Sequence, residues 1–354
     1  MEAALKDDPQ HPRPKNSKLK PGETFQLVPG NHGFAQFATR LLEEKMVTRS
    51  AMKAPSGKSA LDSGNVSVMN ETAAVNETLN EMQRNAGGGT VTEDESRYQV
   101  TVHLPDAASA SDWTGEVVGP PQLFVLKTVN VIAAGKTVIV LDKSNKKLWQ
   151  AALTYSIAAG GGRLSSETPS FGAGPCVEHG DTLYVFDQAV LTAFELNTGN
   201  ARWRLPSVGV VGLFFDDLDN IYVNTTTGNP DDIKYSRQID ISRKTESVLF
   251  KLDPKTGKPL WSIKPGGYVS YLSGKFIYAI QSYDPNPTDE DVLNDMAASL
   301  QKPPYLRIAR IRPADGKIMW EYTQERAPID ARFNDNSIEL IYKREVQVLR
   351  YLAF

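Results

Sequence analysis

Residues that could bind a metal are few in this sequence. Cys176 and His179 form a Cys-x-x-His pair, which contains residue types that zinc prefers. A zinc site needs three or four protein ligands, and this chain has one cysteine and four histidines in distant segments. His179 also precedes Gly180, a residue typical of hairpin turns. We therefore expect no metal site here and interpret His179 as a turn residue.

A cluster of carboxylates lies at Asp216, Asp217 and Asp219. Calcium prefers oxygen ligands of this kind. The cluster separates two apolar runs, GLFF and IYV, and Asp and Asn are ordinary turn residues. The pattern therefore predicts a turn between two strands, and we assign no calcium site to it.

Two long polar segments are the candidate recognition loops. Residues 224–247 and 282–305 interrupt the strand pattern at equivalent places and are rich in Lys, Arg, Tyr and Asp. Loops on a rigid scaffold often carry binding residues. We expect a protein partner to bind there, with Asn224, Tyr235 and Arg237 as candidate contact residues. The alternative is that both segments are solvated excursions without a partner.

The overall charge and hydropathy exclude two classes of protein. The chain has 39 Lys and Arg against 42 Asp and Glu, a net charge of −3, so it lacks the basic surface that nucleic-acid binding needs. The sequence contains no apolar run of about 18 residues, so it predicts no transmembrane helix. The N-terminus has no apolar stretch of the kind found in secretory signals. A complete chain would be cytoplasmic, whereas a longer precursor could carry an export or anchor segment.

A phrase that ends in tryptophan occurs four times, as VLDKSNKKLW, FELNTGNARW, KLDPKTGKPLW and IRPADGKIMW. Gly199, Gly257 and Gly316 stand four residues before their tryptophans. Asn145 takes this place in the first copy. Gly and Asn tolerate the positive φ of a tight turn. Each phrase therefore predicts a strand, a turn, and a second strand that carries the tryptophan.

Two further strands precede each phrase, so the repeating unit is four antiparallel strands. A four-stranded sheet cannot bury both of its faces alone, and several such units must pack together. The pattern predicts an all-β fold, a β-propeller of about five four-stranded blades. We expect the tryptophans to pack between blades rather than to hold a ligand; they are Trp113, Trp149, Trp203, Trp261 and Trp320.

The last repeat contains one strand fewer than the others. Residues 345–354, EVQVLRYLAF, match the third strand of an earlier unit, AVLTAFELNT. An open sheet edge promotes association with other chains. We therefore expect an N-terminal strand, at 97–104 or 112–118, to complete the last blade, with Trp113 as its tryptophan.

The sequence predicts an N-terminal extension over residues 1–95 and the propeller over 96–354. The extension contains only three aromatic residues, too few for a core of its own. Apolar residues at helical spacing predict helices over 33–49 and 68–86, joined by linkers. Either these helices pack on their own domain, or they bind a partner.

The phrase KLDPKTGKPLW resembles the repeat A-x-D-x-x-T-G-x-x-x-W of bacterial PQQ-like β-propellers, and the resemblance covers roughly residues 115–354. This family includes quinoprotein alcohol dehydrogenases and non-enzymatic propellers such as the lipoprotein scaffold of outer-membrane protein assembly. The dehydrogenases generally have eight blades, a disulfide between adjacent cysteines and a calcium site. About five repeats and one cysteine are more similar to the non-enzymatic members, so we expect neither PQQ nor calcium.

The resulting hypothesis is a non-catalytic propeller scaffold that binds protein partners through its polar loops and N-terminal helices. The resemblance implies a periplasmic or membrane-associated place in the bacterial envelope. The alternative is a quinone- or calcium-dependent oxidoreductase, or another enzyme that uses the central propeller face. No catalytic residue is assigned, although propeller sites can draw residues from distant blades.

Overall fold

The fold is known from a computed structural model of the chain. The residues that it describes are 23–30, 33–49, 91–104, 112–154, 156–157, 175–187, 190–206, 210–225, 248–264, 266–273, 275–283, 305–326, 328–334 and 337–350. All regular secondary structure within these residues is β-strand. None of these residues belongs to a helix with the length and apolarity that a membrane crossing requires.

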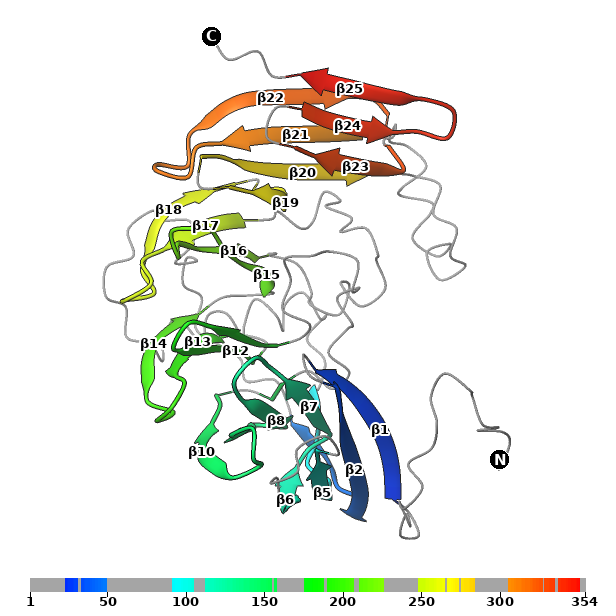
Figure 1. The fold of residues 1–354 in the computed structure, drawn as a ribbon, viewed down its shortest axis with the longest axis vertical. Helices are drawn as coiled ribbons and strands as arrows, with labels where there is room; N and C mark the ends of the chain where they lie inside the picture. The colour runs from blue at the N-terminus through cyan, green and yellow to red at the C-terminus, as the bar shows by residue number, and fades with distance from the viewer. Residues whose placement is uncertain are drawn as a thin grey trace.

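The strands form six consecutive antiparallel sheets and one separate hairpin (Figure 1). The first sheet contains β1 (Glu23–Gly30), β2 (Gly33–Glu43), β5 (Arg97–His103) and β6 (Trp113–Val118), in that order. The hairpin consists of β3 (Met46–Arg49) and β4 (Val91–Asp94). It lies in the connection between the second and third strands of the first sheet.

Four further sheets each contain four strands in chain order. The second sheet has β7 (Pro121–Val125), β8 (Asn130–Ala134), β9 (Thr137–Leu141) and β10 (Lys147–Ala152). The third has β11 (Cys176–His179), β12 (Thr182–Phe186), β13 (Val190–Glu195) and β14 (Ala201–Pro206). The fourth has β15 (Val210–Phe215), β16 (Ile221–Thr225), β17 (Val248–Leu252) and β18 (Pro259–Ile263). The fifth has β19 (Tyr268–Leu272), β20 (Ile277–Tyr283), β21 (Tyr305–Ile311) and β22 (Ile318–Gln324).

The last sheet has three strands, β23 (Asp330–Phe333), β24 (Ser337–Ile341) and β25 (Val346–Arg350).

Burial separates inner from outer strands in the whole series. Every residue of β8 and β17 is buried, as expected for short apolar runs covered on both faces. The outer strand β22 instead alternates exposed and half-buried residues. The outer strands therefore form the rim of the molecule.

The core consists of five apolar clusters, and each lies between two consecutive sheets. Val140 and Leu183, for example, belong to the cluster between the second and third sheets. Phe214 and Ile277 belong to the cluster between the fourth and fifth. The sheets follow one another as layers, and the first and last lie at opposite ends of the view in Figure 1.

The two ends of each sheet differ in their connections. At one end, a short turn joins the third strand to the fourth in the second to fifth sheets, as at Gly199 and Gly257; we call this the turn end. At the other end, the second strand joins the third, and we call this the insertion end. Three sheets carry long connections there, namely residues 44–96, 226–247 and 284–304. Hydrogen bonds between neighbouring sheets join turn end to turn end, as from Trp203 to Pro254, and insertion end to insertion end, as from Asn224 to Gly267. The strand ends that begin the three connections therefore lie on the same side of the molecule.

The helix predicted over 33–49 is wrong. This segment forms β2 and β3, and β2 pairs with β1 on one side and β5 on the other. Ala35 and Phe37, two residues apart, are buried, and Gln36 between them is only half-buried, so the buried positions follow strand rather than helix periodicity. The second predicted helix, over 68–86, lies outside the described residues. The predicted boundary between residues 95 and 96 falls between strands of one sheet.

The predicted closure of the last blade is also wrong. The two candidate strands, 97–104 and 112–118, are β5 and β6, and they pair with each other in the first sheet. The reason is that β2 supplies a partner for β5 that the aromatic-poor N-terminus did not suggest. In the described part of the chain there are therefore five four-stranded sheets and a sixth of three strands, and Trp113 belongs to the first sheet.

Candidate functional site

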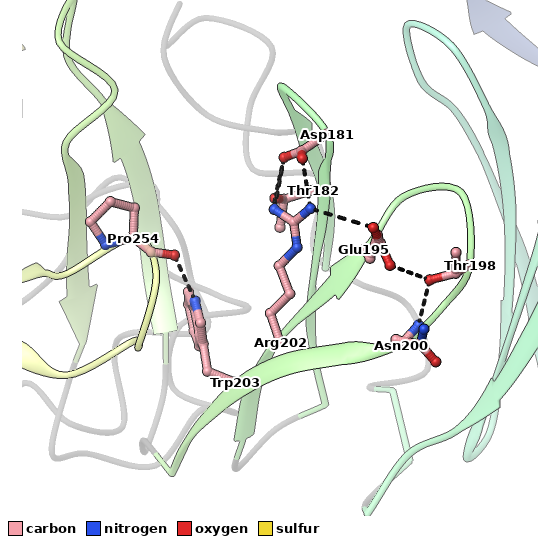
Figure 2. Close-up of polar contacts among 8 residues, drawn as sticks. All are labelled: Asp181, Thr182, Glu195, Thr198, Asn200, Arg202, Trp203 and Pro254. Carbon is pink, nitrogen blue, oxygen red and sulfur yellow. Dashed lines mark hydrogen bonds and ion pairs between the residues drawn. The ribbon is translucent and has the colours of Figure 1, made fainter.

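Three tryptophans link their own sheets to the next by a hydrogen bond from the indole N–H. Trp149 Nε1 donates to the carbonyl of Leu196 at 2.7 Å. In the same way, Trp203 donates to the carbonyl of Pro254 at 2.9 Å and Trp261 donates to the carbonyl of Pro313 at 3.0 Å. Figure 2 shows the bond from Trp203. In each case the acceptor lies three residues before the turn glycine of the next sheet.

The same glycines face the indole rings. A Cβ on Gly257, where φ is +66°, would lie 2.5 Å from two ring carbons of Trp203. Gly199 stands in the same relation to Trp149, and Gly316 to Trp261. Glycine is needed here for two reasons, the positive φ of the turn and the close approach of the ring.

A β-bulge precedes each of the four repeat tryptophans. In each outer strand, one extra residue stands between two paired positions. These residues are Leu148, Arg202, Leu260 and Met319. The bulge turns the extra side chain toward solvent while the tryptophan keeps its inter-sheet position. Leu260 is accordingly 58% exposed beside a half-buried Trp261.

The bulge in the third sheet holds an ion pair. Arg202 donates to both carboxylate oxygens of Asp181, at 2.8 and 2.6 Å, and to Thr182 Oγ1. Figure 2 shows Arg202 and Trp203 leaving β14 toward different neighbours. The hydrogen bond from Arg202 lowers the pKa of Asp181 to about 2. Asp181 remains largely exposed, so this pair adds little to stability.

The first and last tryptophans stand in different surroundings. Trp113 packs in the core between the first two sheets. The first turn has Asn145 in place of glycine, at a φ of 64°, and its side-chain amide donates to the Val102 carbonyl of the first sheet. Trp320 lies in the cluster between the fifth and last sheets, where its ring stacks on Tyr322.

Asn224, predicted to contact a partner, is fully buried in β16. Its side-chain amide donates to the carbonyl of Gly267 at 2.9 Å, and its carbonyl accepts the backbone N–H of Val269 at 3.1 Å. Asn224 therefore links the fourth sheet to the fifth at the insertion end. Tyr235 and Arg237 lie outside the described residues, as do most residues of both predicted loops.

The residues first considered for metal binding have structural contacts. Cys176 is buried in β11, and burial raises the pKa of its thiol. The ring of His179 stacks on Phe215, and its Nε2 lies 2.9 Å from Asp219 Oδ1. Asp216 accepts hydrogen bonds from the backbone and side chains of its own turn. Across the described part of the chain, no group of three His, Cys, Asp or Glu residues is placed to hold a metal.

Sequence reasoning missed the bulges and the role of Asn224. The bulges have a signal in the sequence, since three residues always separate the turn glycine from the tryptophan. Asn224 has no such signal, because its partners Gly267 and Val269 are more than forty residues away.

Several solved structures are similar to this chain at low identity. The crystal structure of BamB from Moraxella catarrhalis is 12% identical, with a TM-score of 0.35, over 72% of this chain and 80% of that chain. Hsv2 from Kluyveromyces lactis is 8% identical, with a TM-score of 0.34, over 74% and 70%. The Pan2 WD40 domain from Neurospora crassa is 10% identical, with a TM-score of 0.34, over 73% and 72%. No curated protein sequence matches this chain.

A family model confirms the resemblance of the repeat. The model described as outer membrane protein assembly factor BamB matches residues 134–351. That range contains all four tryptophan phrases and the three junctions in which an indole donates to the next turn. Because the match spans more than half of its residues, this chain belongs to the PQQ-like β-propeller family of the outer membrane protein assembly factor BamB.

Proposed function

We propose that this chain is a non-catalytic β-propeller scaffold that binds protein partners at its insertion end. The observation that carries the proposal is the position of the long connections. The segments 44–96, 226–247 and 284–304 come from three different sheets, yet all join a second strand to a third. At the turn end, by contrast, connections such as 142–146 and 196–200 are short.

The rigid junctions support this role. The second, third and fourth sheets are each fixed to the next at the turn end by an indole hydrogen bond and a glycine contact, as at Trp203 and Gly257. Asn224 adds a link at the insertion end. A stack fixed in this way can present connections from separate sheets to one partner without reorganising its core.

Exposed apolar side chains also occur at the insertion end. Leu41 and Leu42 lie at the end of β2 before the first long connection, and Met46 lies at the start of that connection; they are 46%, 39% and 58% exposed. Clustered exposed apolar residues commonly mark protein-binding surfaces. The family name refers to assembly of outer-membrane proteins. We therefore place the proposed scaffold at the bacterial envelope, with a protein as its partner.

Site-specific photo-crosslinking tests this proposal. A benzophenone amino acid replaces one exposed lysine at a time in the full chain, in cells of the source organism. Lys264 and Lys343 report on the insertion end, and Lys255 and Lys275 are matched controls at the turn end. We expect a discrete protein adduct from the first pair only. Adducts from the turn-end pair alone, or no adduct at any position, would contradict the proposal.

A further inference from the structure

Exposed lysines and exposed apolar side chains recur together at the turn end. In the second, fourth and fifth sheets, a lysine follows the turn glycine or asparagine, and the bulge residue before the tryptophan is apolar. All of these side chains are exposed. We call them the rim strip; its lysines are Lys146, Lys258 and Lys317, and its apolar residues are Leu148, Leu260 and Met319.

The apolar residues of the rim strip are exposed because of their bulges. Leu148, Leu260 and Met319 are 39%, 58% and 49% exposed. Each is the extra residue of its outer strand, so its side chain faces solvent instead of joining the core. Ile318, next to Met319, is also exposed, at 36%. The rim at the turn end therefore presents a row of aliphatic side chains to solvent.

Contacts between sheets bring the parts of the rim strip together. Leu260 precedes Trp261, whose ring lies against Gly316 in the turn of the fifth sheet. Lys317 follows Gly316 directly, so Leu260 and Lys317 lie at the same junction between neighbouring sheets. Figure 1 shows the hairpin turns that precede β14, β18 and β22 along one side of the molecule. A row arranged in this way indicates a binding surface rather than isolated exposed residues.

The turns of the rim strip carry net positive charge. Residues 142–148 contain three lysines and one aspartate, and residues 253–260 contain two lysines and one aspartate. Residues 312–319 contain Arg312 and Lys317 against Asp315. The aspartates accept backbone N–H groups of their own turns, as Asp253 does from Lys255 at 2.8 Å. Their carboxylates are therefore directed toward the turn backbone, and the excess charge on the rim is positive.

The third sheet interrupts the strip. The equivalent positions there are Asn200 and Arg202, and Arg202 is paired with Asp181. The junction of the fourth and fifth sheets is therefore the most apolar part of the rim. We propose that the rim strip docks on the surface of a membrane that contains anionic lipids. Its lysines contact the headgroup phosphates, and its aliphatic side chains enter the interface below them.

The composition of the strip favours a lipid surface over a protein partner. Protein interfaces are rich in Tyr, Trp and Arg and poor in Lys, whereas lysines beside exposed aliphatic side chains mark segments that lie on membranes. At the insertion end, the exposed Leu41 and Leu42 are instead followed by Glu43 and Glu44, whose carboxylates an anionic surface repels. The molecule thus rests on its turn end and holds these residues away from the membrane.

Co-sedimentation of the full chain with lipid vesicles tests the role of charge. The probes are vesicles of phosphatidylcholine and phosphatidylglycerol in equal parts, and vesicles of phosphatidylcholine alone. We expect binding to the anionic vesicles only. Lys258→Gln combined with Lys317→Gln should weaken it at least about tenfold, because each lysine near an anionic surface contributes to binding. The matched control, Lys264→Gln combined with Lys343→Gln at the insertion end, should leave binding unchanged.

A second pair of variants tests the apolar residues. Leu260→Ser combined with Met319→Ser should weaken vesicle binding at least about fivefold, because less apolar surface enters the interface. Leu41→Ser combined with Leu42→Ser is the control at the insertion end and should have no effect. Circular dichroism checks that every variant is folded.

Three results would overturn the proposal. They are no binding to the anionic vesicles, unchanged binding after either pair of rim substitutions, and an equal loss from the control pairs. Vesicle binding requires no partner protein, so its failure leaves the proposed scaffold function untouched. Loss of the photo-adducts at the insertion end likewise leaves the rim strip untouched.

Discussion

The substitution Gly257→Ala tests the contact between turn glycines and tryptophans. Gly257 has a φ of +66°, and an added Cβ would lie 2.5 Å from Trp203 Cδ2 and Cε3. The left-handed backbone costs a non-glycine residue roughly 1–2 kcal/mol. Overpacking against the ring adds about 1–3 kcal/mol. We therefore expect the free energy of unfolding to fall by about 2–5 kcal/mol.

Gly180→Ala is the matched control. Gly180 also has a positive φ, +58°, but a Cβ there would meet nothing within 4 Å. This substitution should carry only the backbone cost, about 1–2 kcal/mol. The two variants therefore separate the cost of the indole contact from that of the turn.

Urea unfolding followed by far-UV circular dichroism measures both variants. The cost of Gly257→Ala should exceed that of Gly180→Ala by about 1–3 kcal/mol. In a Trp203→Ala background, this excess should disappear, because the clashing ring is gone. Equal costs for the two glycine variants in the parent chain would refute the reasoning.

Three further predictions concern the third sheet. Trp203→Phe keeps a ring but removes the donor to Pro254, so it should cost about 1 kcal/mol or more in urea unfolding, and no loss would argue against the bond. Arg202→Met should destabilise the chain by less than about 1 kcal/mol at pH 5, because Asp181 is exposed. In the folded chain the pKa of Asp181 is lowered to about 2, from an ordinary value near 3.9. The stabilisation by the ion pair is therefore fully present when the pH is above about 3.9, and it is lost as the pH falls toward 2. A difference in melting temperature between parent and variant that grows on acidification would contradict this sign. Cys176 is buried, and burial raises the pKa of its thiol, so iodoacetamide should label it only in urea; rapid labelling of the folded chain would show an accessible thiol.

The repeated part of the fold could be predicted from the sequence because its signals are local. A turn glycine and a tryptophan four residues later lie within one hairpin, so Gly257 and Trp261 identify it without tertiary information. The all-β class and the four-stranded unit follow from the same pattern. The number of sheets could not be predicted from this pattern, because the first sheet contains no copy of the phrase that ends in tryptophan.

The N-terminal strands could not be predicted because their partners are distant. Phe34, Phe37 and Leu41 are spaced three and four residues apart, which suits a helix. The segment is a strand because β5, more than fifty residues later in the chain, pairs with it. Tertiary pairing therefore overrides the local pattern.

The candidate site was harder to predict than the fold. Asn224 was chosen because it borders a polar loop, and the structure places it in a buried link between sheets. A buried amide needs partners for its donor and its acceptor, and here both come from another sheet. The equivalence of the insertions at 226–247 and 284–304 could be recognised, because strands of the same type flank both.

Replacing an insertion by a short turn is the most direct test of the proposed scaffold role. The second sheet joins its second and third strands by Gly135-Lys136 alone, so this pair can replace residues 226–247 between β16 and β17. The measurement is the yield of the Lys264 photo-adduct, compared with that of the parent chain at equal expression and similar melting temperature. We predict that the adduct is lost while the fold is kept. An undiminished adduct from the folded, shortened chain would contradict partner binding through this insertion.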